Sequence, residues 1–473
     1  MNKKNDKVII VLITMAVFLV LSWFIKISSV NTSGMLTEGE IIRLGLFEVL
    51  SMIFYSFQRE IDVILYILMV GGCYGILKNT KSYRKLVDKT SSLIKGHEII
   101  AFAVITLIMG LYVSISSELL ALLLIVPFIV SVFLRRGCDK ITAISAAFGG
   151  IFIGYLGQTF GTYGLQNLLD ATGVTYTDFM WQKWVLFGIA YILYNLFAIL
   201  HIKHTKKKDY TEEDLYCSEK LIENKVPKRK RTKVWPTIVV MVITLSIIML
   251  GYISWNDSFD VKVFTELNTS FQSAMMINDV ALPSTFIGSS MSGLGEWSDF
   301  VHAIFLFLIA TIVIALLNKV SIADMIKDFG RGAKKISKVA IIYALAYTLL
   351  YLFAISPWPA TIIHAIFGEN SYNLFTLFIA AFLVLTVCVD PGYSAAVYGT
   401  FLTYAFADNI VVSTIVWRLG GALSTLIVPT SFLLLMALSY ADIPYKKWLK
   451  YIWKFVVSFA IVALIFLSIV VYM

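Results

Sequence analysis

The amino-acid sequence predicts an all-α polytopic membrane protein with about 11–13 transmembrane or re-entrant helices, arranged as two inverted repeats with paired helical hairpins. Of its 473 residues, 59% are hydrophobic and 15% are charged, and the mean hydropathy is +0.81. Soluble domains carry about 25% charged residues, so this composition excludes a water-soluble fold. At about 20 apolar residues per crossing, the length accommodates roughly ten to thirteen membrane segments.

Apolar runs recur along the whole chain. The run at 8–25 predicts an uncleaved first span, because no small-residue cleavage site follows it. The later runs lie at 61–77, 99–116, 119–134, 141–157, 184–201, 237–253, 300–317, 339–355, 375–389, 392–407, 410–438 and 451–471. The run at 410–438 is too long for one straight crossing and contains two adjacent glycines and Pro429, which predicts a broken helix.

Charge divides the chain into two membrane halves, residues 1–202 and 236–473, joined by a basic loop at 203–235. Eleven of the 39 basic residues lie between Lys203 and Lys233, against six acids. Basic loops mark the cytoplasmic side, so the amino terminus, this loop and the segments 78–98 and 319–338 are predicted to be cytoplasmic. The acidic segment 255–299 is predicted to face outward. The protein is expected in the cytoplasmic membrane, and the basic run offers no support for nucleic-acid binding.

An internal repeat is the most informative feature of the sequence. A displacement of 271 residues, the separation of Thr142 and Ser413, also superposes two glycine pairs and two threonines. The pairs are Gly149 and Gly150 on Gly420 and Gly421, and the threonines are Thr159 on Thr430. Each pair is preceded by an acid at a predicted helix break, Glu118 or Asp390. Duplicated halves with interrupted helices indicate a secondary transporter, with hairpins expected at about 112–162 and 388–431.

These hairpins supply the candidate site residues. Broken helices in lipid free backbone groups, which are tolerated only around a polar cavity that can use them. Substrate binding is predicted for Ser116, Ser117, Gln158, Thr159, Thr162, Ser394, Arg418, Thr430 and Ser431, with Arg418 as the partner of an anionic charge. Coupling of Na⁺ or H⁺ is predicted for Glu118 and Asp390. Hairpin or helix breaks are predicted at Gly149, Gly150, Gly392, Gly420, Gly421 and Pro429.

Each assignment has a structural alternative. The glycine pairs also suit close helix packing. Glu118 and Asp390 would be ordinary loop acids if they lie at the membrane boundary, and Arg418 would form a structural ion pair if it meets Asp390. The chain lacks a phosphate-binding loop, a His-Glu-x-x-His zinc helix and a Gly-x-Ser-x-Gly elbow, so no enzyme, metal or cofactor is predicted beyond a coupling ion.

Three blocks carry a resemblance to a known family. They are residues 61–72 (IDVILYILMVGG), 321–333 (SIADMIKDFGRGA) and 419–431 (LGGALSTLIVPTS). Together they resemble the anaerobic four-carbon dicarboxylate carriers and their YfcC-like branch, within the ion-transporter superfamily. The resemblance implies a secondary carrier of organic anions or amino acids, driven by a cation gradient or by exchange. It also implies a homodimer and elevator-type alternating access.

The sequence departs from this family where substrate contacts are expected. Residues 116–118 read Ser-Ser-Glu in place of a Gly-x-x-Glu-Glu element, and residues 389–394 read VDPGYS in place of a Ser-Gly-Ser-Gly-Lys element. The predicted function is secondary active transport of small organic anions or amino acids, by symport or antiport. The alternative is a non-transporting membrane scaffold built on a degenerate transporter fold.

Overall fold

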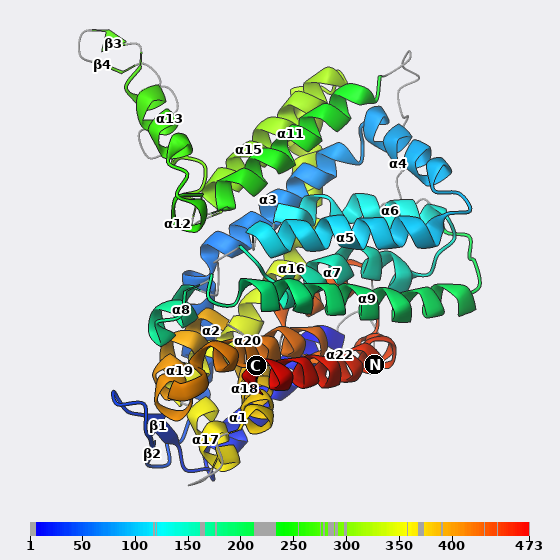
Figure 1. Ribbon diagram of the computed structural model, residues 1–473. Coiled ribbons are helices and arrows are strands. Elements are labelled where there is room, and N and C mark those ends of the chain that lie inside the picture. Colours follow the sequence, from blue (N-terminus) through cyan, green and yellow to red (C-terminus); the bar gives the residue numbers. More distant parts are fainter. Residues whose placement is uncertain are drawn as a thin grey trace.

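The described part of the chain consists of α-helices with two short β-hairpins (Figure 1). The computed structural model describes residues 6–116, 119, 121–160, 166–175, 177–211, 233–253, 255–274, 276–277, 280–281, 288, 292–297, 300–356, 358–367, 373–388, 391–429, 431–441 and 443–472. The strands pair antiparallel as β1 (Ser28–Val30) with β2 (Leu36–Glu38), and as β3 (Met276–Ile277) with β4 (Val280–Ala281).

Helices account for nearly all of the remaining secondary structure. The first half contains α1 (Asp6–Ser22), α2 (Leu46–Arg59), α3 (Ile61–Leu77), α4 (Lys81–Leu93), α5 (Glu98–Ser116), a 3-10 turn (Ala121–Leu124), α6 (Val126–Arg135), α7 (Lys140–Leu156), α8 (Gln166–Thr172) and α9 (Met180–His204). The second half contains α11 (Trp235–Tyr252), α12 (Trp255–Phe259), α13 (Val263–Gln272), α15 (Val301–Leu317), α16 (Ile322–Ile355), α17 (Trp358–Phe367), α18 (Leu374–Val387), α19 (Pro391–Ala405), a 3-10 turn (Ala407–Asn409), α20 (Ile410–Ile427), α21 (Phe432–Tyr440) and α22 (Tyr445–Tyr472).

Several of these helices are long and apolar enough to cross a bilayer. Within the described ranges they are α5, α9, α11, α16, α22 and the segment Ala407–Ile427 that contains α20. The pair α2 and α3, bent by 60°, adds a seventh if it forms one span. Shorter apolar helices, among them α7 and α15, lie between them. The prediction of an all-α polytopic membrane protein is confirmed.

The charged segment at 319–338, predicted to be a loop, is helical. It forms the first half of α16, where Ser321 caps the helix by accepting a hydrogen bond from the Asp324 amide at 3.1 Å. An acidic residue in the first turn and a capping serine are typical helix starts, so the lysines lie on a helix surface. The pattern of charged residues thus predicted where a polar segment lies but not that it is helical. The acidic segment at 255–299 includes α12, α13 and the β3–β4 hairpin, which project from the helical body (Figure 1).

Glycines set the closest helix contacts. A Cβ atom on Gly332 of α16 would lie 2.2 Å from the carbonyl oxygen of Gly71 and 2.8 Å from the Cα of Gly75, both in α3. A Cβ atom on Gly154 of α7 would lie 2.4 Å from the carbonyl oxygen of Gly110 in α5. Because lipid is as apolar as a helix surface, packing at this distance drives helix association in membranes.

The two glycine pairs do not break helices, contrary to the prediction. Gly149 lies inside the continuous helix α7, and Gly421 inside α20, each beside its glycine neighbour (Gly150 and Gly420). A Cβ on Gly149 would lie 2.0 Å from the Tyr194 hydroxyl oxygen, and one on Gly421 would lie 2.3 Å from a methyl carbon of Leu385. The pairs therefore serve close packing, which was the alternative interpretation.

Of the other predicted break positions, Pro429 lies between two helices and Gly392 lies just inside the start of a helix. The long apolar run at 410–438 is divided between α20, which ends at Ile427, and α21, which begins at Phe432, with Pro429 between them. Gly392 lies in the first turn of α19, directly after the interval that follows α18. The prediction that this long run is a broken helix is confirmed.

Three helices of each half share a common spacing. The displacement of 271 residues brings α5, α7 and α9 close to α18, α20 and α22. Gly150 of α7 faces Thr106 and Gly154 faces Gly110, so α5 and α7 run parallel. The halves meet where α3 packs against α16 and α8 against α19, and also where α9 packs against α22 and α7 against α20. The inverted relation between the halves stays a prediction.

The tight contact between α3 and α16 predicts the effect of one added methyl group. In Gly332→Ala the new Cβ collides with backbone atoms that cannot rotate away, and overpacking of this kind costs about 1–3 kcal/mol. We expect a lower thermal unfolding midpoint of the detergent-purified protein. Gly330→Ala is the matched control, because no atom lies within 4 Å of its Cβ. Equal midpoints for the two variants would contradict the packing argument.

Candidate functional site

The carboxyl end of α7 is the centre of the candidate site. The helix ends at Leu156, and Gln158 and Thr159 continue the chain with 1% and 0% of their surface exposed. Ser114, near the end of α5, donates its hydroxyl to the Gly157 carbonyl at 2.5 Å, and its own carbonyl accepts the Thr159 amide at 2.8 Å. These bonds join α5 to α7 and pair backbone groups that a helix end leaves without partners.

Arg418 reaches this helix end from α20 in the other half of the protein. Its guanidinium donates to the carbonyl of Tyr155 at 2.9 Å, to the carbonyl of Gln158 at 3.4 Å, and to the side-chain oxygen of Gln158. In the described part of the chain, the hydrogen-bond acceptors of Arg418 are thus neutral oxygens at the negative end of the α7 dipole.

Lys183 approaches the same place from α9. Its side chain is 1% exposed, and its ammonium group donates to the Thr159 carbonyl and lies 4.8 Å from the ring centre of Phe179. Arg418 is close enough to repel it electrostatically. Two cationic side chains from two helices therefore bind the carbonyls of consecutive residues, Gln158 and Thr159.

Sequence analysis missed Lys183. It directly precedes the apolar run at 184–201, where a lysine is typical of an anchor at the membrane surface. The sequence indicated this lysine only weakly. It lies between Trp181 and Trp184 and follows residues 158–182, which contain no lysine or arginine. Its burial follows from the packing of the start of α9 against the end of α7, which only the structure shows.

The corresponding end of α20 is paired differently. Trp448 of α22 donates its indole N–H to the Leu426 carbonyl at 2.8 Å, and the Tyr445 hydroxyl donates to the Ile427 carbonyl. Trp448 and Lys183 are each the fourth residue of their helix. The end of α7 thus receives two cationic donors and the end of α20 two neutral donors, so the two halves differ in charge where their folds correspond.

The structure brings together three of the predicted substrate residues, Gln158, Thr159 and Arg418. Ser116 is buried and donates to the Tyr112 carbonyl of its own helix at 2.7 Å. Ser431 caps α21, accepting the Leu434 amide at 3.4 Å, and Ser394 is buried in the first turn of α19. The predictions for Ser117, Glu118, Thr162, Asp390 and Thr430 fall outside the described residues.

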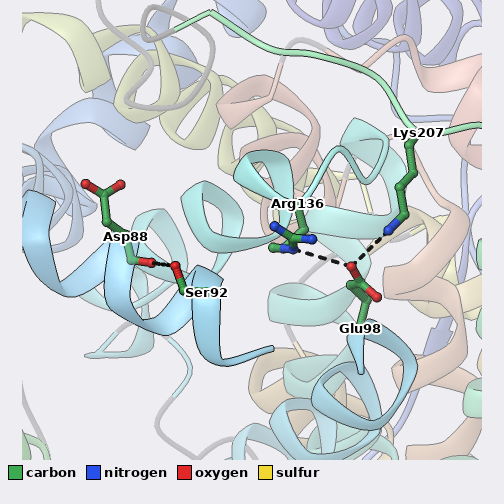
Figure 2. A network of polar contacts seen from close by, with 5 residues as sticks. All are labelled: Asp88, Ser92, Glu98, Arg136 and Lys207. Atoms are coloured by element: carbon green, nitrogen blue, oxygen red, sulfur yellow. Dashed lines mark hydrogen bonds and ion pairs between the residues drawn. The ribbon is translucent and has the colours of Figure 1, made fainter. Parts of the chain in front are cut away.

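A second polar cluster lies at the opposite end of α7, about 25 Å away for a helix of this length. Asp139 caps α7, accepting the Thr142 amide at 3.1 Å and its hydroxyl at 2.6 Å, and its other oxygen lies 3.3 Å from Nε2 of His201. Beside it, Glu98 accepts hydrogen bonds from Lys207 at 3.0 Å and Arg136 at 3.4 Å (Figure 2).

This second cluster caps α7 and pairs the acidic side chains around its start. A cavity of about 200 Å³ is lined by Glu98, Asp139 and lysines at the end of α9. Burial alone would raise the pKa of Asp139, but hydrogen bonds from His201 and Thr142 outweigh it and lower that pKa to about 2. Across the described ranges, no group of three or more His, Cys, Asp or Glu side chains could hold a metal ion.

Comparison with known families decides the class of the protein. The sequence model of the C4-dicarboxylate anaerobic carriers (DcuC) matches residues 6–472, nearly the whole chain. The chain belongs to the C4-dicarboxylate anaerobic carrier family. It is therefore a multi-pass membrane transporter, and membership of this family supports a carrier rather than an enzyme.

Relatives and solved structures are similar at low identity. An uncharacterized protein of Haemophilus influenzae is 23% identical over 414 residues, covering 83% of this chain and 72% of that protein. The YdaH transporter of Alcanivorax borkumensis is 12% identical, with coverage of 98% of this chain and 97% of its own and a TM-score of 0.42. Neisseria gonorrhoeae MtrF, described among antimetabolite efflux pumps, is 13% identical, with coverage of 98% and 94% and a TM-score of 0.40.

The hydrogen bonds of Asp139 predict a loss of stability in acid. Its folded-state pKa of about 2 lies below the ordinary 3.8, so its contribution of about 2 kcal/mol is complete above about pH 5 and is lost as the pH falls toward 2. We expect the thermal midpoint of the wild type to fall more steeply between about pH 5 and pH 3 than that of Asp139→Asn. Asp88→Asn, which changes an exposed carboxylate paired with Arg135, is the control and should keep the wild-type slope. Parallel curves for the wild type and Asp139→Asn would refute this role.

Proposed function

We propose that the protein is a secondary active transporter of small dicarboxylates across the cytoplasmic membrane. The observation that carries this proposal is the pair of cationic side chains, Lys183 and Arg418, at the buried end of α7. The name of the family to which the chain belongs supports the same substrate class.

Charge favours a dianion over the other substrates considered. Two cations in a poorly solvated site, bound to main-chain carbonyls, gain most from a ligand that carries two negative charges. An arginine binds one carboxylate through two parallel N–H bonds, and a lysine binds a second as a point charge. A zwitterionic amino acid would bring a further positive charge to the site. We therefore place dicarboxylates ahead of amino acids.

Burial supports alternating access. Because Gln158 and Thr159 are enclosed, a substrate reaches them only after α9 or α20 moves away from the end of α7. Ser114 joins the ends of α5 and α7. Hydrogen bonds of Tyr191, Tyr194 and Asn195 hold α9 against these two helices, whereas Arg418 links the end of α7 to α20. We propose an elevator-type motion with α5 and α7 moving as one unit. Glu118 and Asp390 remain the proposed Na⁺ or H⁺ acids of the hairpins, with Ser394, Thr430 and Ser431 as proposed substrate contacts.

Orientation and assembly complete the proposal. Basic segments favour the cytoplasmic side of a membrane, so we place the amino terminus and the central segment 203–233 there. A homodimer remains the proposed assembly. Neither feature is needed for the charge argument at the end of α7.

The proposal is tested by succinate uptake into proteoliposomes. We expect Lys183→Met and Arg418→Gln each to lower uptake at least about tenfold, equivalent to about 1.4 kcal/mol, because each removes one of two carboxylate partners. Competition by butyrate, a monocarboxylate, should be weak in the wild type and relatively stronger in Lys183→Met.

Lys203→Met is the matched control, because Lys203 is exposed at the other end of α9. Gel filtration and the thermal midpoint show whether each variant is folded. Wild-type succinate uptake in both site variants, with folded protein, would rule out the proposed site. Absence of succinate uptake by the wild type would rule out the proposed substrate class.

A further inference from the structure

A carboxylate held by two phenols lies at the junction of α2 and α3. Glu60 separates the two helices where the chain bends by 60°. One of its oxygens accepts the Tyr343 hydroxyl at 2.6 Å, and the other accepts the Tyr351 hydroxyl at 2.5 Å. Both tyrosines belong to α16, and Glu60 itself is half-buried.

The surroundings of Glu60 are apolar. α2 and α3 together are apolar enough to form one bent span, and α2 exposes Phe47 and Phe54, each to 78%. An acid within such a span is costly unless it is paired, hydrated or neutralised. Over the ranges that the structure describes, Glu60 has no ion-pair partner within 4 Å, and its neighbour Arg59 is exposed.

We propose that Glu60 binds and releases one proton during the transport cycle. The inference rests on the proposed function for its transport measurement and goes beyond it by naming the coupling ion and a residue that binds it. When charged, the carboxylate accepts a hydrogen bond from each of the two phenol hydroxyls. When it takes a proton from water, one of its oxygens becomes a donor, so one phenol must rotate to accept or lose its bond. The phenols keep their own protons throughout.

The geometry favours a proton over a metal ion. Both phenol hydrogens point at the carboxylate oxygens, so the positive ends of two O–H dipoles occupy the side from which a cation would approach. Hard metal cations are held by several oxygen ligands. A proton needs only a lone pair on one oxygen of Glu60.

The positions of the contacts with α16 show which helix protonation of Glu60 would move. The far end of α3 is locked to α16 by the close contacts of Gly71 and Gly75 with Gly332. At the junction, the links to α16 are the two phenol bonds, a bond from the Ser56 hydroxyl to the Ala344 carbonyl at 2.6 Å, and the ring contact of Tyr55 with Tyr351. Loss of one phenol bond would therefore loosen α2 more than α3.

Among the described residues, other titratable groups also lie near the junction. Arg59 and Tyr55 of α2 act electrostatically on Tyr351, and exposed Asp62 lies one residue beyond Ile61 in α3. The ring of Tyr347 in α16 is tilted by 35° against that of Tyr343, with ring centres 4.6 Å apart. Of the two carboxylates at this junction, Glu60 is the one that both phenols contact.

Transport with and without a pH gradient tests the inference. In proteoliposomes we expect an inward proton gradient to accelerate succinate uptake by the wild type at least about tenfold. Glu60→Gln, which keeps the shape but cannot titrate, should retain succinate counterflow and lose that acceleration. Asp62→Asn is the matched control and should behave as the wild type. Full gradient acceleration in Glu60→Gln would overturn the inference.

A spectroscopic measurement separates this inference from the proposed function. Subtracting the pH-difference infrared spectrum of Glu60→Gln from that of the wild type cancels the other carboxyl groups and should leave one protonated-carboxyl band. Tyr351→Phe removes one donor to the charged form, so its band should titrate at higher pH. Tyr351→Phe also keeps the inference testable if Glu60→Gln does not fold. Absence of that band after the subtraction, or an unchanged midpoint in Tyr351→Phe, would contradict proton binding. If the wild type takes up no succinate, the proposed substrate is wrong and the infrared result still decides the role of Glu60.

Discussion

The pairing of backbone carbonyls at the end of α7 is the interaction on which the candidate site depends. A helix that ends inside an apolar domain leaves carbonyls that no water can reach, and each unpaired group is costly. Here the donors come from three other helices: Ser114 of α5, Lys183 of α9 and Arg418 of α20. The same contacts that satisfy the backbone therefore bring two positive charges to one buried place, where an anion has most to gain.

Close packing makes this arrangement possible. Ser114 reaches the end of α7 because glycines let α5 and α7 lie side by side, as shown by the contact of Gly154 with Gly110. Gly149 leaves room for the hydroxyl of Tyr194, which brings α9 alongside the same helix. The glycines of α7 thus set the distances that place Lys183, although they contact no substrate themselves.

Two features distinguish the halves despite their shared helix order. The end of α20 is paired by neutral groups of Trp448 and Tyr445, so the two cationic donors lie at the end of α7 and not at the end of α20. The junction at Glu60 has no bent counterpart, because α16 is one continuous helix over the corresponding stretch. The two halves therefore differ in the charge at the ends of α7 and α20 and in the bend at Glu60, which are the two places where we propose substrate and proton binding.

Composition and apolar runs were sufficient to determine the membrane class and the break near Pro429, because hydrophobicity and helix-breaking residues act locally along the chain. The internal repeat and the long broken segment also predicted Gln158, Thr159 and Arg418 as site residues, and their role stays a prediction. The tertiary structure alone decided that Gly149 and Gly421 pack rather than break, since a small residue permits both outcomes and only the neighbouring helix selects one. It alone revealed Lys183 and Glu60, because their burial depends on contacts with residues distant in the sequence.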